Sequence, residues 1–390
     1  MVLFYFFVFS VAVTIYIVYY LLSKNHDYWK KRKVPHLKPS LLFGNYKETI
    51  LLKKHQTQVA YDICKQFPGK IKGMFHLVKN CANQLECLIR EKMEISPNID
   101  AKQLLAMFTI DIITSCAFGI NCNSMNKNAD MTSNPFLAVR ERIIDTSKSA
   151  GVKLYCRQMW PQIFYGLGFS LFDKNIYYFF RNILAGVFES REGKPSTTND
   201  FVDLILTWKK NKVITGVSLS NEKTGAKKEL TMDVDDDLLI SQCVAIFGAG
   251  FETTATTLSF LLYEMAKNQD AQTKLIEEVD SYFEKNETIE YECVNELPYI
   301  AACIDETLRL YPVLGLLTRE VMDDYTFPTG LRLKKGDRIH VPIYHIHRNP
   351  DYFPEPEVFR PERFYGDAKK DIKPFTFFPF GEGPRICLGK

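Results

Sequence analysis

The chain has 390 residues, of which 46% are hydrophobic and 24% charged, which is an ordinary globular balance with enough apolar residues for a sizeable core. The formal net charge of +3 is small and no long basic run occurs in the body of the chain, which argues against a dedicated nucleic-acid-binding protein. Ten cysteines are scattered without a Cys-x-x-Cys pair, so zinc-ribbon and dithiol-redox sites lack their usual spacing. Most of these cysteines are expected to be small apolar residues in a reducing compartment.

The first segment, Met1–Leu22, carries no charge and consists mostly of aliphatic and aromatic residues. A membrane-spanning helix needs about 20 such residues. A cleaved signal peptide would need a preceding basic residue, a shorter apolar run and an Ala-x-Ala-like site, none of which is present. We therefore predict a transmembrane anchor over residues 1–22. Basic residues dominate positions 24–33, which predicts that residues 24–390 face the cytosol.

Residues 23–45 are predicted to form a basic, proline-containing hinge, and residues 46–390 a mainly α-helical body with a small β portion. Helical spacing of apolar residues predicts helices at 58–66, 72–92, 100–119, 134–149, 176–189, 200–209, 235–268, 270–283 and 297–311. Residues 215–231 are predicted to form a polar surface loop. Short strands are expected at 325–327, 331–333 and 339–342, and the chain from Arg348 onward, rich in Pro and Phe, is expected to be irregular.

The strongest chemical signal is the segment Phe380–Gly389, which reads FGEGPRICLG. Two glycines and a proline make a rigid turn that lets the backbone approach a flat cofactor. The thiolate of Cys387 at its tip can ligate iron, and Arg385 can pair with a carboxylate on the same cofactor. Backbone N–H groups near the sulfur would tune its electron donation. The alternative is a surface loop with an incidental cysteine.

A second signal, Ala249–Thr254, lies in the middle of the longest predicted helix. Gly248 and Gly250 each destabilise a helix interior by roughly 1 kcal/mol relative to Ala, and such local violations are expected at functional sites. The small residues would let the helix lie flat over a macrocycle, and Thr253 would bond back to the helix and open a gap for dioxygen. Glu252 and Thr253 would then deliver protons. The alternative is a buried helix that packs through its glycines.

A third signal is the pair Glu306 and Arg309, which share a helix face at i and i+3. On a surface such a pair contributes little. Pro361–Phe364, which contains Arg363, follows downstream in the irregular tail.

Together these motifs resemble those of the cytochromes P450, and the resemblance runs from the first segment to the last residue. It is closest to the microsomal, insect-type detoxification members. The resemblance implies a cytochrome P450 fold with an N-terminal transmembrane helix and a haem (heme, iron protoporphyrin IX) ligated by the Cys387 thiolate, which favours O–O cleavage. It implies that Glu306, Arg309 and Arg363 form a buried network that fixes the loop behind the haem.

The same resemblance assigns the remaining site residues by matched position. The cofactor would be held by Ala249, Gly250, Arg319, Phe380, Gly381, Arg385, Cys387 and Gly389, with Arg319 at a propionate-binding position. Catalytic proton delivery would fall to Glu252 and Thr253. The substrate would contact Ile246, Phe247, Ala249, Val313, Leu314 and Leu317.

The resemblance also implies a function. A monooxygenase of this kind inserts one atom of O2 into an apolar small molecule, here a xenobiotic, with electrons from NADPH passed by NADPH-cytochrome P450 reductase. Cytochrome b5 is a second candidate electron donor. The location implied is the endoplasmic reticulum membrane, with the catalytic domain facing the cytosol and no nucleic-acid partner.

Two departures from the family pattern predict an incomplete fold. The family has a Trp-x-x-x-Arg motif that contacts the haem propionates, but none of Trp29, Trp160 and Trp208 has an Arg four residues later. We interpret this as an internal segment missing near Lys70. The family also continues into a further helix beyond Lys390.

Two rival functions follow from these observations. An inactive, membrane-anchored truncated form, or a fragment of a gene model, is favoured by the missing segments. A haem-thiolate isomerase or dehydratase that needs no reductase is disfavoured by the intact Glu252–Thr253 pair.

Two further groups carry weaker signals. His345 and His347 are suited to metal binding but lack a third ligand, so alternation near a strand end is preferred. Lys369, Lys370 and Lys373 would face an acidic electron donor or form a solvated charge run.

Overall fold

The computed structural model describes residues 67–126, 134–144, 147–170, 172–194, 200–217, 229–383 and 386–389. The predicted anchor (1–22), the hinge (23–45), the first predicted helix (58–66) and Arg385 lie outside these residues. The chain divides into two compact units. Thr146–Leu171 and Val321–Asp337 belong to the smaller unit, and Lys54–Asp145, Phe172–Glu320 and Arg338–Lys390 form the larger one.

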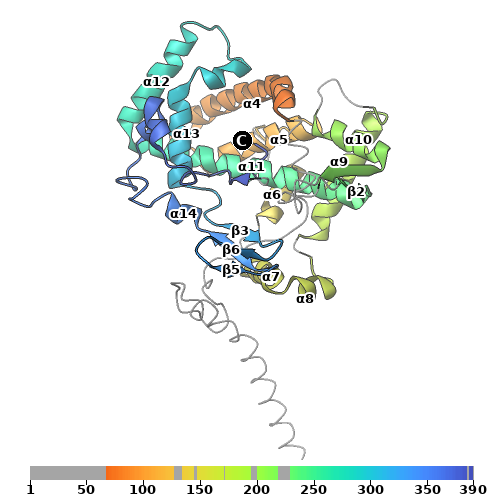
Figure 1. The fold of residues 1–390 in the computed structure, drawn as a ribbon. Helices are drawn as coiled ribbons and strands as arrows, with labels where there is room; N and C mark the ends of the chain where they lie inside the picture. Colours follow the sequence, from red (N-terminus) through yellow and green to blue (C-terminus); the bar gives the residue numbers. More distant parts are fainter. Residues whose placement is uncertain are drawn as a thin grey trace, which may run out of the picture. The chain divides into compact units, whose positions relative to one another are not determined.

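The larger unit is mainly helical, as the sequence predicts (Figure 1). Its α-helices are α4 (Phe67–Ile95), α5 (Ala101–Ile113), α6 (Pro135–Ile143), α9 (Lys174–Ser190), α10 (Phe201–Asn211), α11 (Asp236–Lys267), α12 (Gln269–Phe283), α13 (Pro298–Leu310) and α14 (Ile343–Ile346). The segment η1 (Thr114–Phe118) is a π-helix. Short 3-10 helices occur at η3 (Tyr291–Asn295), η4 (Pro361–Phe364) and η5 (Gly366–Asp371). In the described part of the tail after α14, the regular elements are the short 3-10 helices η4 and η5, as expected from its proline content.

Side-chain caps explain where the principal helices begin. Asp100 accepts a hydrogen bond from the backbone N–H of Gln103 at 3.0 Å, and Asp235 accepts one from Leu238 at 2.7 Å. The predicted end at Gly119 is confirmed, because this residue takes the left-handed conformation, with φ of 63°. The helix predicted over 134–149 is too long, since α6 ends at Ile143.

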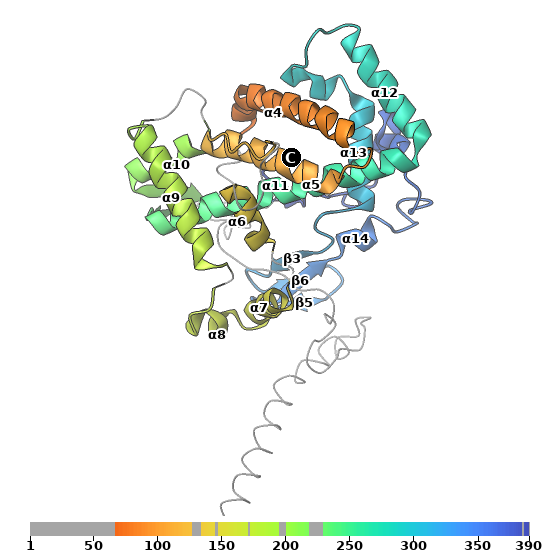
Figure 2. The same cartoon turned by 180° about the vertical axis from the view of Figure 1, so that it is seen from behind.

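Helix α11 organises the core of the larger unit and packs against α5, α9, α10 and α13 (Figures 1 and 2). Phe247 and Phe251 of α11 are fully buried in a cluster with residues of α5, α6, α9 and α10. Ala101–Phe118 and Asp236–Lys267 are the two described helices long and apolar enough to cross a membrane. Both supply side chains to this core, so length and composition alone do not place them in a bilayer.

Two antiparallel strand pairs complete the larger unit. Strands β1 (Val213–Val217) and β2 (Glu229–Asp233) pair with Val213 opposite Asp233, so the prediction of a loop throughout 215–231 is wrong at both ends. Strand β3 (Leu317–Glu320), which was not predicted, pairs with β6 (Arg338–Val341). The β6 strand confirms the prediction for 339–342 to within a residue.

The smaller unit contains α7 (Lys148–Met159), α8 (Pro161–Gly166), β4 (Tyr325–Thr326) and β5 (Arg332–Leu333). Strands β4 and β5 confirm the strands predicted at 325–327 and 331–333, and they pair antiparallel. Helices α7 and α8 were not predicted as separate helices. Large apolar side chains on and after α8 are exposed, and they are Ile163, Tyr165, Leu167 and Phe169.

Candidate functional site

The cysteine turn is closed by backbone hydrogen bonds. The N–H of Cys387 donates to the carbonyl of Phe380 at 2.9 Å, and that of Gly381 donates to Phe378 at 2.9 Å. Gly381 and Gly383 have φ of 74° and 77°, a conformation that other residues rarely adopt, which explains why glycine occupies both positions. The backbone therefore holds the cysteine at the end of a compact loop.

The thiol of Cys387 is suited to bind iron as a single ligand. Its side chain is exposed, and its Sγ accepts the N–H of Gly389 at 3.4 Å. Among the described residues no group of three or more His, Cys, Asp or Glu side chains could hold a metal ion. A single thiolate of this kind is suited to a haem, which brings donors of its own for the iron. The donated N–H would moderate the electron density that the sulfur gives to the metal.

Helix α11 bonds three of its own hydroxyl groups back to its backbone near the predicted oxygen site. Thr253 donates to the carbonyl of Ala249 at 2.6 Å, Thr254 to Gly250 at 2.9 Å and Thr257 to Thr253 at 3.0 Å. Such bonds compete with the helical ladder and bend helices. The bond from Thr253 is the one that the sequence predicts.

One strip of α11 is left uncovered by the described protein. Ile246, Ala249 and Thr253 recur at helical spacing, with Ala249 exposed and the other two partly exposed. Phe247 and Phe251, on another side of the helix, are fully buried. Along this strip a flat cofactor can contact α11.

Phe247 does not line a substrate pocket, which corrects the prediction from matched position. Its ring lies 5.9 Å from Phe136, 5.4 Å from Phe180 and 5.0 Å from Phe251, measured between ring centroids, and it is 0% exposed. Successive helical residues are rotated by about 100°, so Ile246 can be partly exposed while its neighbour is a core residue.

Of the two glycines of α11, Gly250 has a packing role, whereas a side chain at Gly248 would meet only an ordinary contact. A Cβ on Gly250 would lie 2.6 Å from Cδ1 of Ile113 on α5, and one on Gly248 would lie 3.6 Å from Cγ2 of Ile143. Gly250 therefore lets α5 and α11 approach each other. The predicted alternative, a helix that packs through its glycines, applies to this position.

Glu252 lies beside basic residues of two other helices. Its Oε1 is 3.8 Å from Nζ of Lys102 on α5, and its Oε2 is 4.0 Å from a guanidinium nitrogen of Arg140 on α6. Its Oε2 is buried and has no hydrogen-bond partner among the described residues. The two cations therefore attract the Glu252 carboxylate electrostatically, without a hydrogen bond to Oε2.

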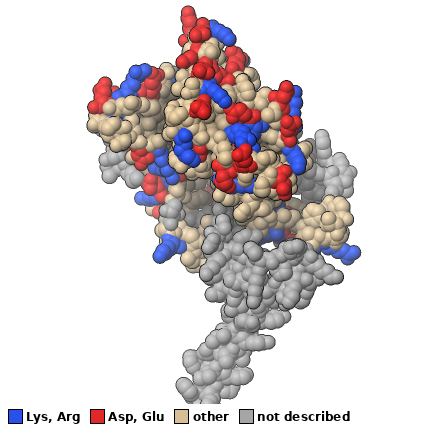
Figure 3. Space-filling model, turned by 90° about the vertical axis from the view of Figure 1, so that its left-hand side faces the viewer, with Lys and Arg blue, Asp and Glu red and all other residues tan. Residues whose placement is uncertain are grey.

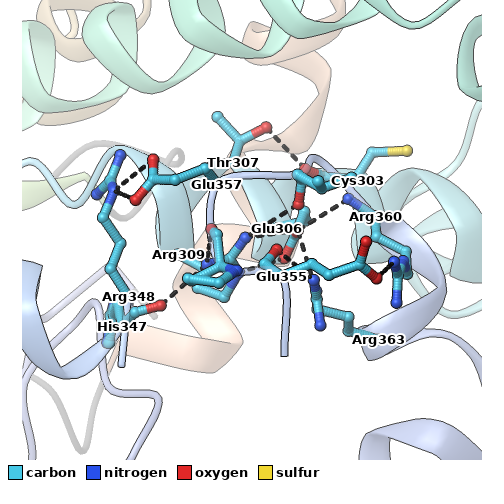
Figure 4. A network of polar contacts seen from close by, with 12 residues as sticks. Cys303, Glu306, Thr307, Arg309, His347, Arg348, Glu355, Glu357, Arg360 and Arg363 are labelled. Atoms are coloured by element: carbon cyan, nitrogen blue, oxygen red, sulfur yellow. Dashed lines mark hydrogen bonds and ion pairs between the residues drawn. The ribbon is translucent and has the colours of Figure 1, made fainter. Parts of the chain in front are cut away.

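Glu306, Arg309 and Arg363 lie together, as the family resemblance implies (Figure 4). Glu306 and Arg309 are both 0% exposed and form a two-point ion pair, with N–O distances of 2.7 and 2.8 Å. Nε of Arg363 is 3.4 Å from Oε1 of Glu306, and burial lowers the pKa of Arg363. The backbone N–H of Arg360 also donates to Glu306, at 2.8 Å.

Arg309 joins this ion pair to the irregular tail. Its guanidinium donates to the carbonyls of His347 at 2.9 Å, Pro356 at 2.8 Å and Val358 at 3.3 Å. A buried charge needs such partners, since an ion pair alone does not offset the loss of water. The network therefore fixes a stretch of chain that has almost no regular secondary structure.

The other predicted cofactor and substrate residues lie on or near β3. Leu317 and Arg319 share one face of the β3–β6 pair, because residues two apart in a strand point the same way. Arg319 donates to the carbonyl of Thr318 at 3.1 Å. Val313 and Leu317 are partly exposed and Leu314 is 53% exposed.

The weaker candidates are resolved in different ways. His345 is exposed and His347 fully buried, and both lie at the short helix α14 rather than at a strand end, so the two rings do not converge on a metal. His347 was missed as a structural residue, and no sequence signal separated it from His345. Lys369 and Lys370 form ion pairs with Asp305 and Asp367. Figure 3 shows acidic and basic side chains intermixed on one side of the molecule rather than a patch of one sign.

A family model described as cytochrome P450 matches residues 11–390. Cytochrome P450 6B1 of Papilio polyxenes is 30% identical, over 97% of this chain and 88% of that protein. Cytochrome P450 6B5 of Papilio glaucus is 30% identical over 98% and 93%. Cytochrome P450 6A1 of Musca domestica is 34% identical over 82% of this chain and 61% of that protein.

The alignment with the Papilio polyxenes protein is longer than the part of this chain that it uses. It extends over 453 positions, although only 97% of the 390 residues take part. That relative therefore has residues without a counterpart in this chain.

Proposed function

This chain belongs to the cytochrome P450 family, and from that premise we propose that Cys387 is the thiolate ligand of its haem and that the substrate is an apolar xenobiotic. The function common to the family is that of a haem-thiolate monooxygenase. When bound, the haem activates dioxygen, so that one oxygen atom enters the substrate and the other leaves as water. The observation that carries the proposal is the exposed Cys387 thiol at the end of the hydrogen-bonded turn.

The remaining cofactor contacts are proposed around that sulfur. The turn residues Phe380, Gly381 and Gly389 would bring backbone close to the cofactor, which the hydrogen bond from Cys387 to Phe380 and the positive φ of Gly381 support. Ala249 of α11 would contact the opposite face, since it is exposed on the uncovered strip. Arg319 on β3 would pair with a propionate, and Arg385, outside the described residues, would do the same.

Proton delivery is proposed for Thr253 and Glu252. The hydroxyl of Thr253 lies on the uncovered strip and already bonds to Ala249, which fixes its position. Glu252 lies between Lys102 and Arg140 without a hydrogen bond to either, so its carboxylate remains able to accept a proton or a water molecule. This arrangement supports monooxygenation over a haem-thiolate isomerase or dehydratase, which needs no such delivery.

A substrate of apolar character is supported by the residues near β3. Val313, Leu314 and Leu317, together with Ile246 on α11, are aliphatic and at least partly exposed. Exposed aliphatic side chains at these positions favour a ligand that makes few hydrogen bonds. These residues give no preference for one carbon of the substrate over another.

We propose an endoplasmic reticulum membrane location with the catalytic domain, residues 46–390, facing the cytosol. The uncharged segment 1–22 and the basic residues after it support this orientation. Exposed aromatic and aliphatic side chains after Trp160, on and beyond α8, give independent support for contact with a lipid surface. Electrons would come from NADPH-cytochrome P450 reductase, with cytochrome b5 as a second donor.

A second candidate is an inactive, membrane-anchored truncated form. The relative of Papilio polyxenes has residues without a counterpart here, and this chain lacks a Trp-x-x-x-Arg motif. Absorbance of the full chain in membranes, reduced and treated with carbon monoxide, separates the two. A strongly red-shifted haem band supports the thiolate site, and absence of any haem band supports the inactive form.

Activity with added reductase then tests the reaction class. Consumption of NADPH and oxygen with formation of a hydroxylated product supports the monooxygenase. Turnover of a substrate without NADPH would instead support the isomerase or dehydratase.

A further inference from the structure

We propose that His347 is a positioning residue that connects the buried Glu306–Arg309 ion pair to the cysteine turn and so holds the turn in place. This inference rests on the proposed function of Cys387 as the haem ligand. His347 makes one hydrogen bond through its backbone and one through its ring. Its backbone carbonyl accepts the guanidinium of Arg309 at 2.9 Å, and its ring Nε2 accepts the backbone N–H of Phe378 at 3.1 Å.

The hydrogen bonds continue from Phe378 to the ligand. The carbonyl of Phe378 accepts the N–H of Gly381, and the carbonyl of Phe380 accepts the N–H of Cys387, each at 2.9 Å. The chain between α14 and the cysteine has almost no regular secondary structure to fix it otherwise. Among the described residues, His347 thus links the ion pair to the turn, because its backbone bonds to Arg309 and its ring bonds to Phe378.

Packing fixes the orientation of the ring. His347 is 0% exposed and lies between two aromatic side chains, with centroid distances of 5.3 Å to Phe377 and 5.6 Å to Phe378. Because Nε2 accepts a hydrogen bond, the neutral ring must carry its proton on Nδ1. No rotation of the ring is needed to bring Nε2 to the amide, and the side chain has little room to leave it.

Substitution can separate the acceptor from the volume of the ring. His347→Leu fills comparable space without an acceptor and leaves the Phe378 amide buried and unpaired, because Phe378 is 8% exposed. His347→Gln retains a side-chain oxygen that can accept the same N–H. His345→Leu, on the exposed neighbour two residues earlier, is the matched control.

The experiment measures two properties of the full chain in membranes. The first is hydrogen exchange at the Phe378 amide, with α11 amides as a reference for folding. The second is the fraction of haem that shows the red-shifted band after reduction and carbon monoxide treatment. We expect His347→Leu to speed exchange at Phe378 by about 5- to 100-fold and to lower the red-shifted fraction, since leaving a buried amide unpaired has an effect of that order. His347→Gln and His345→Leu should stay close to wild type.

The outcomes separate this inference from the proposed function. If the wild type shows no red-shifted band, the proposed ligand fails, whatever the exchange results. If the wild type shows the band and His347→Leu retains both the band and the protection of Phe378, the positioning role is overturned. Equal losses in the Leu and Gln variants would also overturn it, because volume rather than the acceptor would then matter. Should neither variant fold, exchange in the wild type decides: the Phe378 amide must be as protected as α11, and exchange at the rate of an unstructured peptide contradicts the proposal.

Discussion

The phenol of Tyr311 donates a hydrogen bond of 2.5 Å to the carboxylate of Glu264, and this bond joins the end of α13 to α11. Glu264 is 1% exposed, and its other oxygen accepts from Asn268 at 2.8 Å. The ring of Tyr311 also stacks on Phe260 of α11, with centroids 4.2 Å apart. Burial and the neighbouring carboxylate raise the pKa of Tyr311, so the phenol stays a donor at neutral pH. These contacts hold α11, which carries Glu252 and Thr253, against the end of α13, which carries Glu306 and Arg309.

Tyr311→Phe removes this bond while keeping the ring stack. We expect a loss of about 1–3 kcal/mol in the free energy of unfolding, because a buried carboxylate loses one of its donors. Chemical denaturation measures the change, and Tyr344→Phe, on a ring that is 46% exposed, is the control. Equal stability of the two variants would show that Glu264 does not depend on Tyr311.

Gly250→Ala tests the close approach of α5 and α11. The added Cβ would meet Ile113 at 2.6 Å, so we expect destabilisation by about 1–3 kcal/mol. Ile113→Val in the same chain should recover part of the loss. Gly186→Ala on α9, where a Cβ meets nothing within 4 Å, is the matched control and should be neutral or stabilising by up to about 1 kcal/mol. Thermal unfolding of the four proteins decides, and a neutral Gly250→Ala would contradict the packing role.

Thr253→Val removes the hydroxyl on the uncovered strip of α11. The haem band should remain, because the proposed ligand is Cys387 and not Thr253, whereas product formed per NADPH consumed should fall several-fold when the proton donor is lost. Thr273→Val on α12 removes the same kind of back-bond, Thr273 to the carbonyl of Gln269 at 3.0 Å, away from the site. A similar yield of product in the two variants would remove Thr253 from proton delivery.

The acid stability of the fold should depend on His347. Burial lowers the pKa of this ring to about 4, and the guanidinium groups of Arg309 and Arg348 also disfavour its protonation, while the carbonyls of Leu308 and Arg309 oppose the shift. Since the unfolded ring has a pKa near 6.5, the unfolded chain binds the extra proton first as the pH falls. Stability is therefore fully present above about pH 6.5 and decreases towards pH 4 by about 3 kcal/mol.

Denaturation curves at several pH values test this dependence. In His347→Gln the decrease between pH 6.5 and 4 should shrink by about 3 kcal/mol, because a glutamine at position 347 does not titrate. His345→Gln, at an exposed site, should keep the wild-type profile. If the wild-type and His347→Gln profiles run parallel, the buried ring is not the group that limits acid stability.

Much of the helical framework could be predicted from the sequence because caps and periodicity coincide there. Helix α11 begins within one residue of the prediction, directly after the cap at Asp235, and the end at Gly119 follows from its left-handed conformation. The contact of Glu306 and Arg309 with Arg363, far along the chain, could be expected only from the family resemblance. Spacing alone indicates no more than the pair within α13.

The errors have physical causes in long-range contacts. Strand β3 has four residues, all partly exposed, and its partner β6 begins 18 residues later. The sequence therefore shows neither an alternating apolar pattern nor a tight turn that would indicate this strand. Phe247 resembles a pocket residue beside Ile246, but the rings that bury it come from α6 and α9. The space that requires glycine at 250 is occupied by Ile113, which no local pattern could reveal.

The measurement that tests the account most directly is the absorbance of reduced, carbon-monoxide-treated protein after replacement of single cysteines. Cys387 and Cys87 are the two exposed free cysteines among the described residues, so Cys87→Ser is the matched control for Cys387→Ser. The account predicts that the strongly red-shifted haem band survives in Cys87→Ser and disappears in Cys387→Ser. An unchanged red-shifted band in Cys387→Ser would contradict the assignment of the ligand.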